Sequence, residues 1–177
     1  MAGMAHSRYG GPSYTGAPAL PVTAALVQAG GGPAKFSAAT ALTAMVGKKL
    51  VGQEVAKLTK QYGAEPIKSW LAVFDFAVKD ALKIATDAGV ALPHGTLKGK
   101  ALATALVTAG LDKDNTFYVE FMLDKALSHK IHEKVMDDID AKFGADADTS
   151  YHRITNQAMY DLAQALGAKQ VKLAEFH

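Results

Sequence analysis

An internal repeat constrains the fold of this chain more than any other feature of its sequence. When the sequence is aligned with itself so that Phe36 meets Phe117, an offset of 81, residues 36–80 match residues 117–161 at core-type positions. The matched pairs include Leu42 with Leu123, Leu50 with Ile131, Leu58 with Ile139 and Trp70 with Tyr151. Upstream, the string ALVQAG recurs as ALVTAG at an offset of 80. A fixed offset at apolar positions is the pattern of a duplicated unit, so we expect two related halves.

Helical signals dominate both halves. Gly and Pro residues separate stretches whose apolar residues recur at spacings of three and four, and no alternating run of β-branched residues is flanked by hairpin turns. Ser37 fits the N-cap of the second helix, and Thr116 fits the N-cap of the sixth. The sequence therefore predicts an all-α fold of about seven helices, at residues 21–29, 37–46, 51–62, 65–88, 100–109, 117–143 and from about 146–149 to 167.

Composition limits the class of protein. A chain of 177 residues with 49% hydrophobic and 20% charged residues is typical of one compact globular domain. The formal net charge of +2 indicates no broad surface for nucleic acid. Cysteine is absent, which excludes disulfides and thiolate sites. No apolar run is long enough for a membrane span, and no secretory signal precedes the fold, so we expect a soluble protein, cytoplasmic or the mature form of an exported one.

The chain divides at its changes of composition. Residues 1–17 form an arm rich in Gly and Tyr, residues 18–92 the first repeat, residues 93–99 a linker with Pro and Gly, and residues 100–167 the second repeat. The tail, residues 168–177, suits either an extended strand or a helical turn. In the arm, Tyr9 and Tyr14 lie beside glycines, which favours docking onto a protein partner or a second copy of the chain, a loose terminal tail being the alternative.

Three histidines in the second repeat are the main candidates for a ligand site. His129, His132 and Glu133 share one face of the predicted helix 117–143, and His152 follows on the next helix. This pattern suits a divalent transition metal, or one imidazole as an axial haem ligand. The alternative is a hydrogen-bonded core histidine, because an apolar residue, Val51, stands at the position equivalent to His132.

Carboxylates recur in both halves of the chain. Asp80 matches Asp161 in the alignment of the two repeats, and Asp75 lies on the same apolar helix as Asp80. Such carboxylates cap helices or pair across the axis between two repeats, and a pocket where Asp80 and Asp161 meet is the basis of an enzyme hypothesis. No nucleophile elbow, phosphate loop, zinc-protease or dinucleotide motif is present.

Residues 28–37 (QAGGGPAKFS) resemble a string found in truncated globins. The resemblance covers ten residues and implies haem as a possible cofactor. The ten residues that follow contain no histidine, so we do not assign the chain to that family.

Three hypotheses follow. The first is a non-enzymatic binding or assembly protein that acts through its surface, its arm or an apolar pocket between the repeats. The second is a helical protein that binds haem or a transition metal through histidine. The third is an enzyme with a carboxylate pocket between the repeats.

Overall fold

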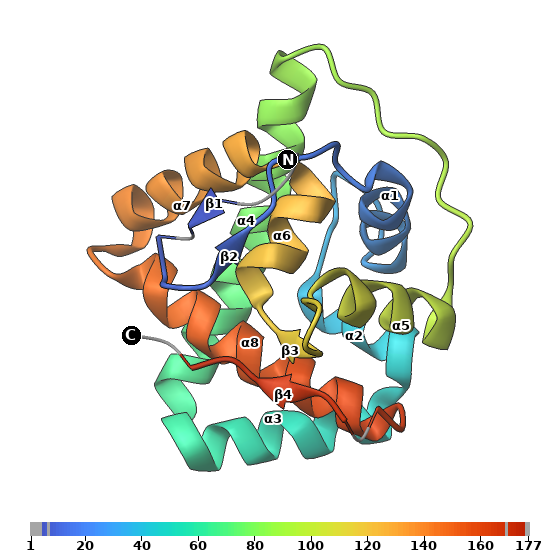
Figure 1. Ribbon diagram of the computed structural model, residues 1–177, viewed down its shortest axis with the longest axis vertical. Helices are drawn as coiled ribbons and strands as arrows, with labels where there is room; N and C mark the ends of the chain where they lie inside the picture. Colours follow the sequence, from blue (N-terminus) through green and yellow to red (C-terminus); the bar gives the residue numbers. More distant parts are fainter. Residues whose placement is uncertain (1–4, 7, 169, 176–177) are drawn as a thin grey trace.

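The fold is helical, as the sequence predicts. The structure, a computed structural model, describes residues 5, 6, 8–168 and 170–175, the first two by their backbone alone. The parts of the predicted arm and tail at residues 1–4, 7, 169 and 176–177 lie outside the described residues. The described helices are α1 (Leu20–Ala29), α2 (Ala38–Val46), α3 (Lys48–Tyr62), α4 (Ala64–Asp87), α5 (Gly99–Ala109), α6 (Val119–Leu127), α7 (His129–Phe143) and α8 (Ala147–Ala165) (Figure 1). None of these helices is both long and apolar enough to cross a membrane.

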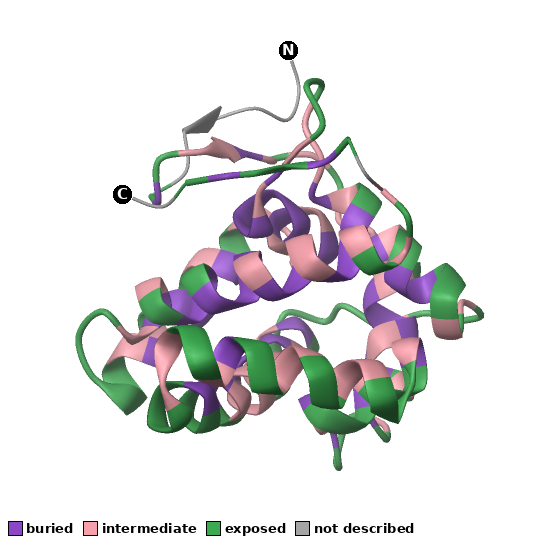
Figure 2. Cartoon of the chain, turned by 90° about the horizontal axis from the view of Figure 1, so that it is seen from below, coloured by how far each residue is buried: buried purple, intermediate pink, exposed green. Residues whose placement is uncertain are grey.

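Short strands lie near both ends of the described chain. Strand β1 (Ala5–His6) pairs antiparallel with β2 (Pro12–Ser13), and β4 (Lys172–Leu173) pairs parallel with β3 (Thr116–Phe117). Both terminal segments lie along one face of the body (Figure 2). Of the two conformations predicted for the tail, the described part takes the extended one.

The number of helices differs from the prediction because the expected helix 117–143 is two helices. Ser128 breaks it with φ 98° and ψ 151°, a conformation that non-glycine residues rarely adopt. Gly47, at the equivalent position of the first repeat, has φ 87° and ψ 155°. The serine therefore makes the turn that glycine makes in the first half, and α7 starts in a new direction.

The ends of the helices repeat at the offset found in the sequence. The bounds of α2 and α6, and the bounds of α3 and α7, are equivalent positions of the two repeats. A Cβ atom on Gly30 would collide with the ring of Phe36, and one on Gly110 would collide with the ring of Phe117. Glycine is thus required at the end of ALVQAG and of ALVTAG, because the backbone there passes close to an aromatic ring.

The first N–H groups of α2 and α6 are capped by equivalent residues of α4 and α8. The Ala38 N–H donates to Asp75 Oδ1 at 2.7 Å, and the Val119 N–H donates to Asn156 Oδ1 at 3.0 Å. Ser37 also accepts from Thr40, as predicted for an N-cap. Thr116 is not the cap of α6, because it lies in β3. A helix start is therefore fixed in each half by the long C-terminal helix of that half.

The contacts between the two halves also repeat at this offset. The helix α4 lies against α7, and α8 lies against α3, while α4 and α8 also contact each other. One apolar core lies among α3, α4, α7 and α8, and another lies among α1, α2, α5, α6 and the end of α8. Duplication of the unit stays a prediction, which a superposition of residues 36–80 on residues 117–161 tests.

Candidate functional site

The break at Ser128 creates a buried polar cluster between α6, α7 and α8. Asp124 lies in the last turn of α6, and His132 lies in the first turn of α7. The helix α8 runs back beside α7 and brings His152 next to His132. Asp124, His132 and His152 are at most 1% exposed, so each needs partners within the protein.

The carboxylate of Asp124 accepts four hydrogen bonds. Its Oδ2 accepts from Ser13 Oγ at 2.8 Å and from the backbone N–H of Tyr14 at 3.0 Å. His129 Nδ1 lies 3.1 Å from the same oxygen, and His132 Nδ1 lies 2.7 Å from Oδ1. Burial disfavours the charged form, but the hydrogen bonds and the charge of His132 hold the pKa of Asp124 below its ordinary value. Asp124 is therefore ionised and only accepts.

His132 and His152, here called the imidazole pair, face each other through their Nε2 atoms, which lie 2.9 Å apart. The Nδ1 of His152 lies 2.9 Å from the backbone carbonyl oxygen of Asp148, and the Nδ1 of His132 faces the Asp124 carboxylate. Both partners only accept, so both Nδ1 atoms carry a proton. A positive species must then lie between the two Nε2 atoms, because two bare lone pairs at this distance repel.

A proton fits between the two rings. Burial, together with the charge of His132, lowers the pKa of His152 well below its ordinary value, so His152 is neutral and accepts through Nε2. His132 is then the imidazolium and donates to both Asp124 and His152. Its charge is balanced by the carboxylate of Asp124, as a buried ion requires.

A divalent metal ion is the other species that fits the imidazole pair. At His–metal distances of about 2.0–2.1 Å, nitrogen atoms 2.9 Å apart subtend an angle of about 90° at the metal. In metal sites the second nitrogen of each histidine is held by a carboxylate or a backbone carbonyl, as it is here. Within the described part of the chain, however, no group of three His, Asp or Glu ligands includes the pair.

The four predicted metal ligands separate into two groups. His132 and His152 form the imidazole pair, whereas His129 and Glu133 lie outside it. The Nε2 of His129 lies 3.7 Å from Glu133 Oε1, and Glu133 Oε2 accepts from Arg8 at 3.2 Å. His129 Nδ1 also lies 2.8 Å from Ser13 Oγ, so both residues contact the arm, and Glu133 is part of a surface ion pair.

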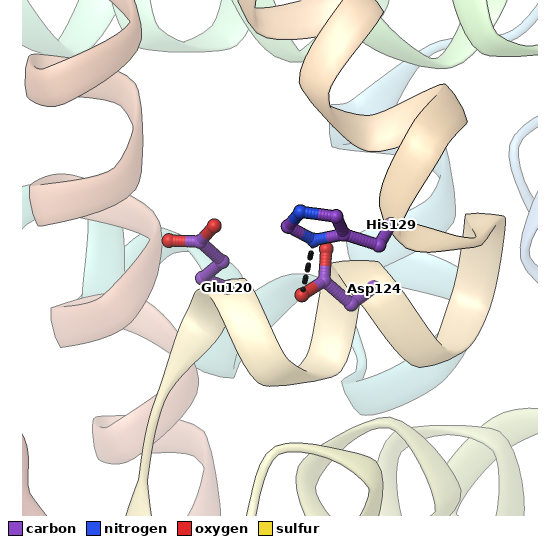
Figure 3. A group of neighbouring side chains, drawn as sticks. All are labelled: Glu120, Asp124 and His129. Atoms are coloured by element: carbon purple, nitrogen blue, oxygen red, sulfur yellow. Dashed lines mark hydrogen bonds and ion pairs between the residues drawn. The ribbon is translucent and has the colours of Figure 1, made fainter. Parts of the chain in front are cut away.

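Glu120, Asp124 and His129 form a second grouping that the sequence did not indicate (Figure 3). The helix α6 presents the two carboxylates one turn apart, and one ligand atom of each residue lies within 4.8 Å of the others. The spacing suits a cation, but Asp124 already accepts four hydrogen bonds, one of them from His129. Asp124 and His129 also both contact Ser13 Oγ, so these two side chains already have hydrogen-bond partners within the protein.

The arm covers this cluster with its aromatic residues. The ring of Tyr9 stacks on His152 at 4.0 Å between centroids, and its hydroxyl donates to Asp148 Oδ2 at 2.5 Å. Tyr14 packs edge-on against Phe121 at 5.9 Å. Both predicted anchors thus contact the body of their own chain, and docking onto a partner stays a prediction.

Beside the imidazole pair lies an apolar cavity, cavity A, of about 260 Å³. Side chains from every helix except α3 line it, almost all of them aliphatic or aromatic. His132 forms part of its wall, and Val90, which is 38% exposed, lies where the cavity approaches the surface. The sequence predicts an apolar pocket between the repeats only in general terms, since a void depends on how the helices pack.

The carboxylates at matched positions of the two repeats, Asp80 and Asp161, have separate partners. Asp80 hydrogen-bonds to Asp138 on α7, and the burial of Asp80 and the charge of Asp138 raise the pKa of Asp80 to about 6. Asp161 accepts from Lys57 on α3 at 2.7 Å and shares a hydrogen bond with Glu54. Asp80 and Asp161 thus each pair with residues of the other half, and not with each other.

Residues 28–37, which resemble the truncated-globin string, form the connection from α1 to α2. Gly30 accepts a backbone hydrogen bond from Ser37 at 2.9 Å, and Gln28 lies 3.1 Å from His94 Nδ1. Comparisons with protein-family models, with curated proteins and with solved structures found no match to this chain.

Proposed function

We propose that this protein is a non-enzymatic binding protein that holds a small apolar molecule in cavity A. The volume of the cavity supports the proposal, because protein interiors contain few voids larger than a water molecule. An empty void costs on the order of 24 cal/mol per Å³, which is about 6 kcal/mol for cavity A. The free energy of unfolding of a whole domain is about 5–15 kcal/mol. A bound ligand offsets a cost of this size.

The polar groups in the wall of cavity A favour an apolar ligand. Both ring nitrogens of His132 are used by Asp124 and His152. Thr155 accepts from Trp70 at 2.8 Å and also hydrogen-bonds to Tyr151. His132 and Thr155 are therefore not free for the head group of a charged ligand or for acid–base chemistry. Since a cavity of about 150 Å³ holds benzene, cavity A suits a molecule on the order of ten carbon atoms.

Access to cavity A is available at the segment between α4 and α5. Val90 and Leu92 of that segment line the cavity together with Pro18 and Leu20 at the start of α1. The segment runs over the surface as a long connection without helix or strand (Figure 1). Such connections move more readily than packed helices, so displacement of Val90 and Leu92 would admit a ligand.

Naphthalene, with ten carbon atoms, is the test ligand. Calorimetric titration should give saturable binding to the wild-type protein, and Ala77→Leu, which fills cavity A, should weaken it at least tenfold. Ala158→Leu is the matched control, because Ala158 is the counterpart of Ala77 in the second repeat and lines a different cavity. Absence of saturable binding, or equal affinity of Ala77→Leu and wild type, would contradict the proposal.

A second candidate function, transition-metal binding, is favoured by the convergence of the imidazole pair. Titration with Zn²⁺ should then give one site that His152→Gln removes and Glu133→Gln leaves intact. Haem is a weaker fit, because an axial ligand needs an Nε2 that faces open space, and each Nε2 here faces the other ring. Equal Zn²⁺ affinity of wild type and His152→Gln would exclude the metal site.

A further inference from the structure

A second cavity, cavity B, lies beside cavity A. It has about 300 Å³ and is lined by residues of α2, α3, α4 and α8. Leu42, Phe74, Thr155 and Met159 line both cavities and so form the wall between them. Cavity B also has the only tryptophan of the chain, Trp70, in its wall.

The two cavities are equivalent under the repeat. Positions that line cavity B in the first repeat have counterparts in the second repeat that line cavity A. Examples are Val46 with Leu127, Leu50 with Ile131 and Val55 with Met136. Phe74 and Thr155, which are themselves counterparts, belong to both cavities. Cavity B is therefore the counterpart of cavity A.

The polar residues of the two cavities differ at equivalent positions. Cavity A has His132 where cavity B has Val51, and cavity B has Glu54 where cavity A has Val135. Cavity B is also lined by Asp161 and Lys57. Cavity B therefore has carboxyl groups in its wall, which cavity A lacks.

Glu54 and Asp161 form an acid–carboxylate pair in the wall of cavity B. Asp161 Oδ1 accepts from Lys57 Nζ at 2.7 Å and from Gln157 Nε2 at 3.0 Å. Glu54 Oε1 and Asp161 Oδ2 are buried, and no N–H group of the described residues donates to either atom. The two carboxyl groups hydrogen-bond to each other. Burial, and then the hydrogen bond and charge of Asp161, raise the pKa of Glu54 to about 8. Glu54 therefore carries the shared proton at neutral pH.

We propose that cavity B is a second ligand site, specific for a small molecule with an apolar body and a basic amine. The body occupies the apolar chamber, and the ammonium group replaces the shared proton between Glu54 and Asp161. Glu54 releases that proton to solvent as the cationic amine enters, so the net charge of the site is unchanged. A carboxylate ligand is disfavoured, because Asp161 is already anionic.

The proton released on binding gives the site a distinct signature. Below pH 8 the affinity for an amine should rise roughly tenfold per pH unit, because one proton leaves for each ligand that binds. Asp161 and Lys57 are the charged groups that face Glu54. Both keep their charge through this range, because the pKa of Asp161 is lowered and that of Lys57 is raised. A neutral ligand of the same shape should show no such dependence.

The test uses 2-phenylethylamine as the probe, ethylbenzene as its neutral counterpart and the fluorescence of Trp70 as the readout. We expect the amine to bind the wild-type chain at least tenfold more tightly than ethylbenzene at pH 7, with release of close to one proton measured by calorimetry in two buffers. Ala158→Leu should abolish the response of Trp70, and Ala77→Leu should retain it. The outcome is independent of naphthalene binding in cavity A, since each cavity is filled by its own variant.

Two substitutions of Glu54 isolate the head group. Glu54→Val introduces the residue type found at the equivalent position of cavity A, and Glu54→Gln keeps the size while removing the charge. Both should lower the affinity for the amine at least tenfold and remove its pH dependence, and Glu54→Gln serves alone if Glu54→Val does not fold. Equal affinity for the amine and ethylbenzene, an unchanged affinity in Glu54→Gln, or no response of Trp70 would overturn the proposal.

Discussion

The Nε2 atoms of His132 and His152 lie 2.9 Å apart, which ties the protonation of each imidazole to the other. We predict that a single proton lies between the two Nε2 atoms and that the carboxylate of Asp124 balances its charge, because each Nδ1 already donates to an acceptor. Nitrogen-15 NMR of the imidazoles measures this directly. Two Nε2 atoms that both lack a proton would contradict the shared proton, and a zinc-dependent shift of both Nε2 signals would show a metal in its place.

Ser128 is a position where glycine should stabilise the protein. Its backbone conformation costs on the order of 1–3 kcal/mol for a residue with a side chain. Ser128 also accepts from the Ile131 N–H at 3.3 Å, and glycine loses only a few tenths of a kcal/mol at such a cap. We expect Ser128→Gly to raise the free energy of unfolding by about 1 kcal/mol and Ser128→Ala to lower it by about 1 kcal/mol. Urea denaturation measures both, and the reverse order would refute the strain.

Tyr9 should contribute more to stability than its place in a terminal arm suggests. It is 8% exposed, stacks on His152 and donates to Asp148. Tyr9→Phe leaves the buried carboxylate without that donor and should cost about 1–3 kcal/mol. Tyr9→Ala also removes the ring and should cost about 3–5 kcal/mol. Thermal unfolding measures these losses, and unchanged stability of Tyr9→Ala would show that the arm does not dock in solution.

Glu54 should make stability depend on pH between about 5 and 8. The folded protein holds a proton on Glu54 up to about pH 8, and the unfolded chain loses that proton near 4.5. The contribution of Glu54 is therefore complete at low pH and is lost as the pH rises to 8. His152 has the opposite effect, because its lowered pKa makes stability fall as the pH drops below 6.5. The difference in unfolding midpoint between wild type and Glu54→Gln, measured at each pH, isolates the contribution of Glu54. A difference that does not change with pH would contradict the shared proton.

Helix positions were largely predictable from the sequence, because glycines mark most of the turns. The exception is Ser128, where the sequence shows a serine in place of the glycine of the first repeat. The repeat itself held the signal, since Gly47 is the equivalent residue and ends α2. A serine in a conformation that favours glycine is not expected from local propensity.

The break at Ser128 also explains why the sequence does not predict Asp124 as the partner of His132. In one continuous helix, eight residues span about 12 Å, so the two side chains would not meet. In the structure they lie 2.7 Å apart, because the chain changes direction between them. The proximity of His132 and His152 follows from the hairpin of α7 and α8 and was predictable. The cavities were not, since their volumes depend on how all the helices pack.

Cavity A should be a dry, apolar chamber that admits a small apolar ligand. A crystal structure of the protein under xenon pressure tests it most directly, because xenon occupies empty apolar cavities. We predict xenon among Leu82, Met122 and Val135, with the peak lost in Ala77→Leu and retained in Ala158→Leu. Ordered water in that space, or side chains that close it, would contradict the claim.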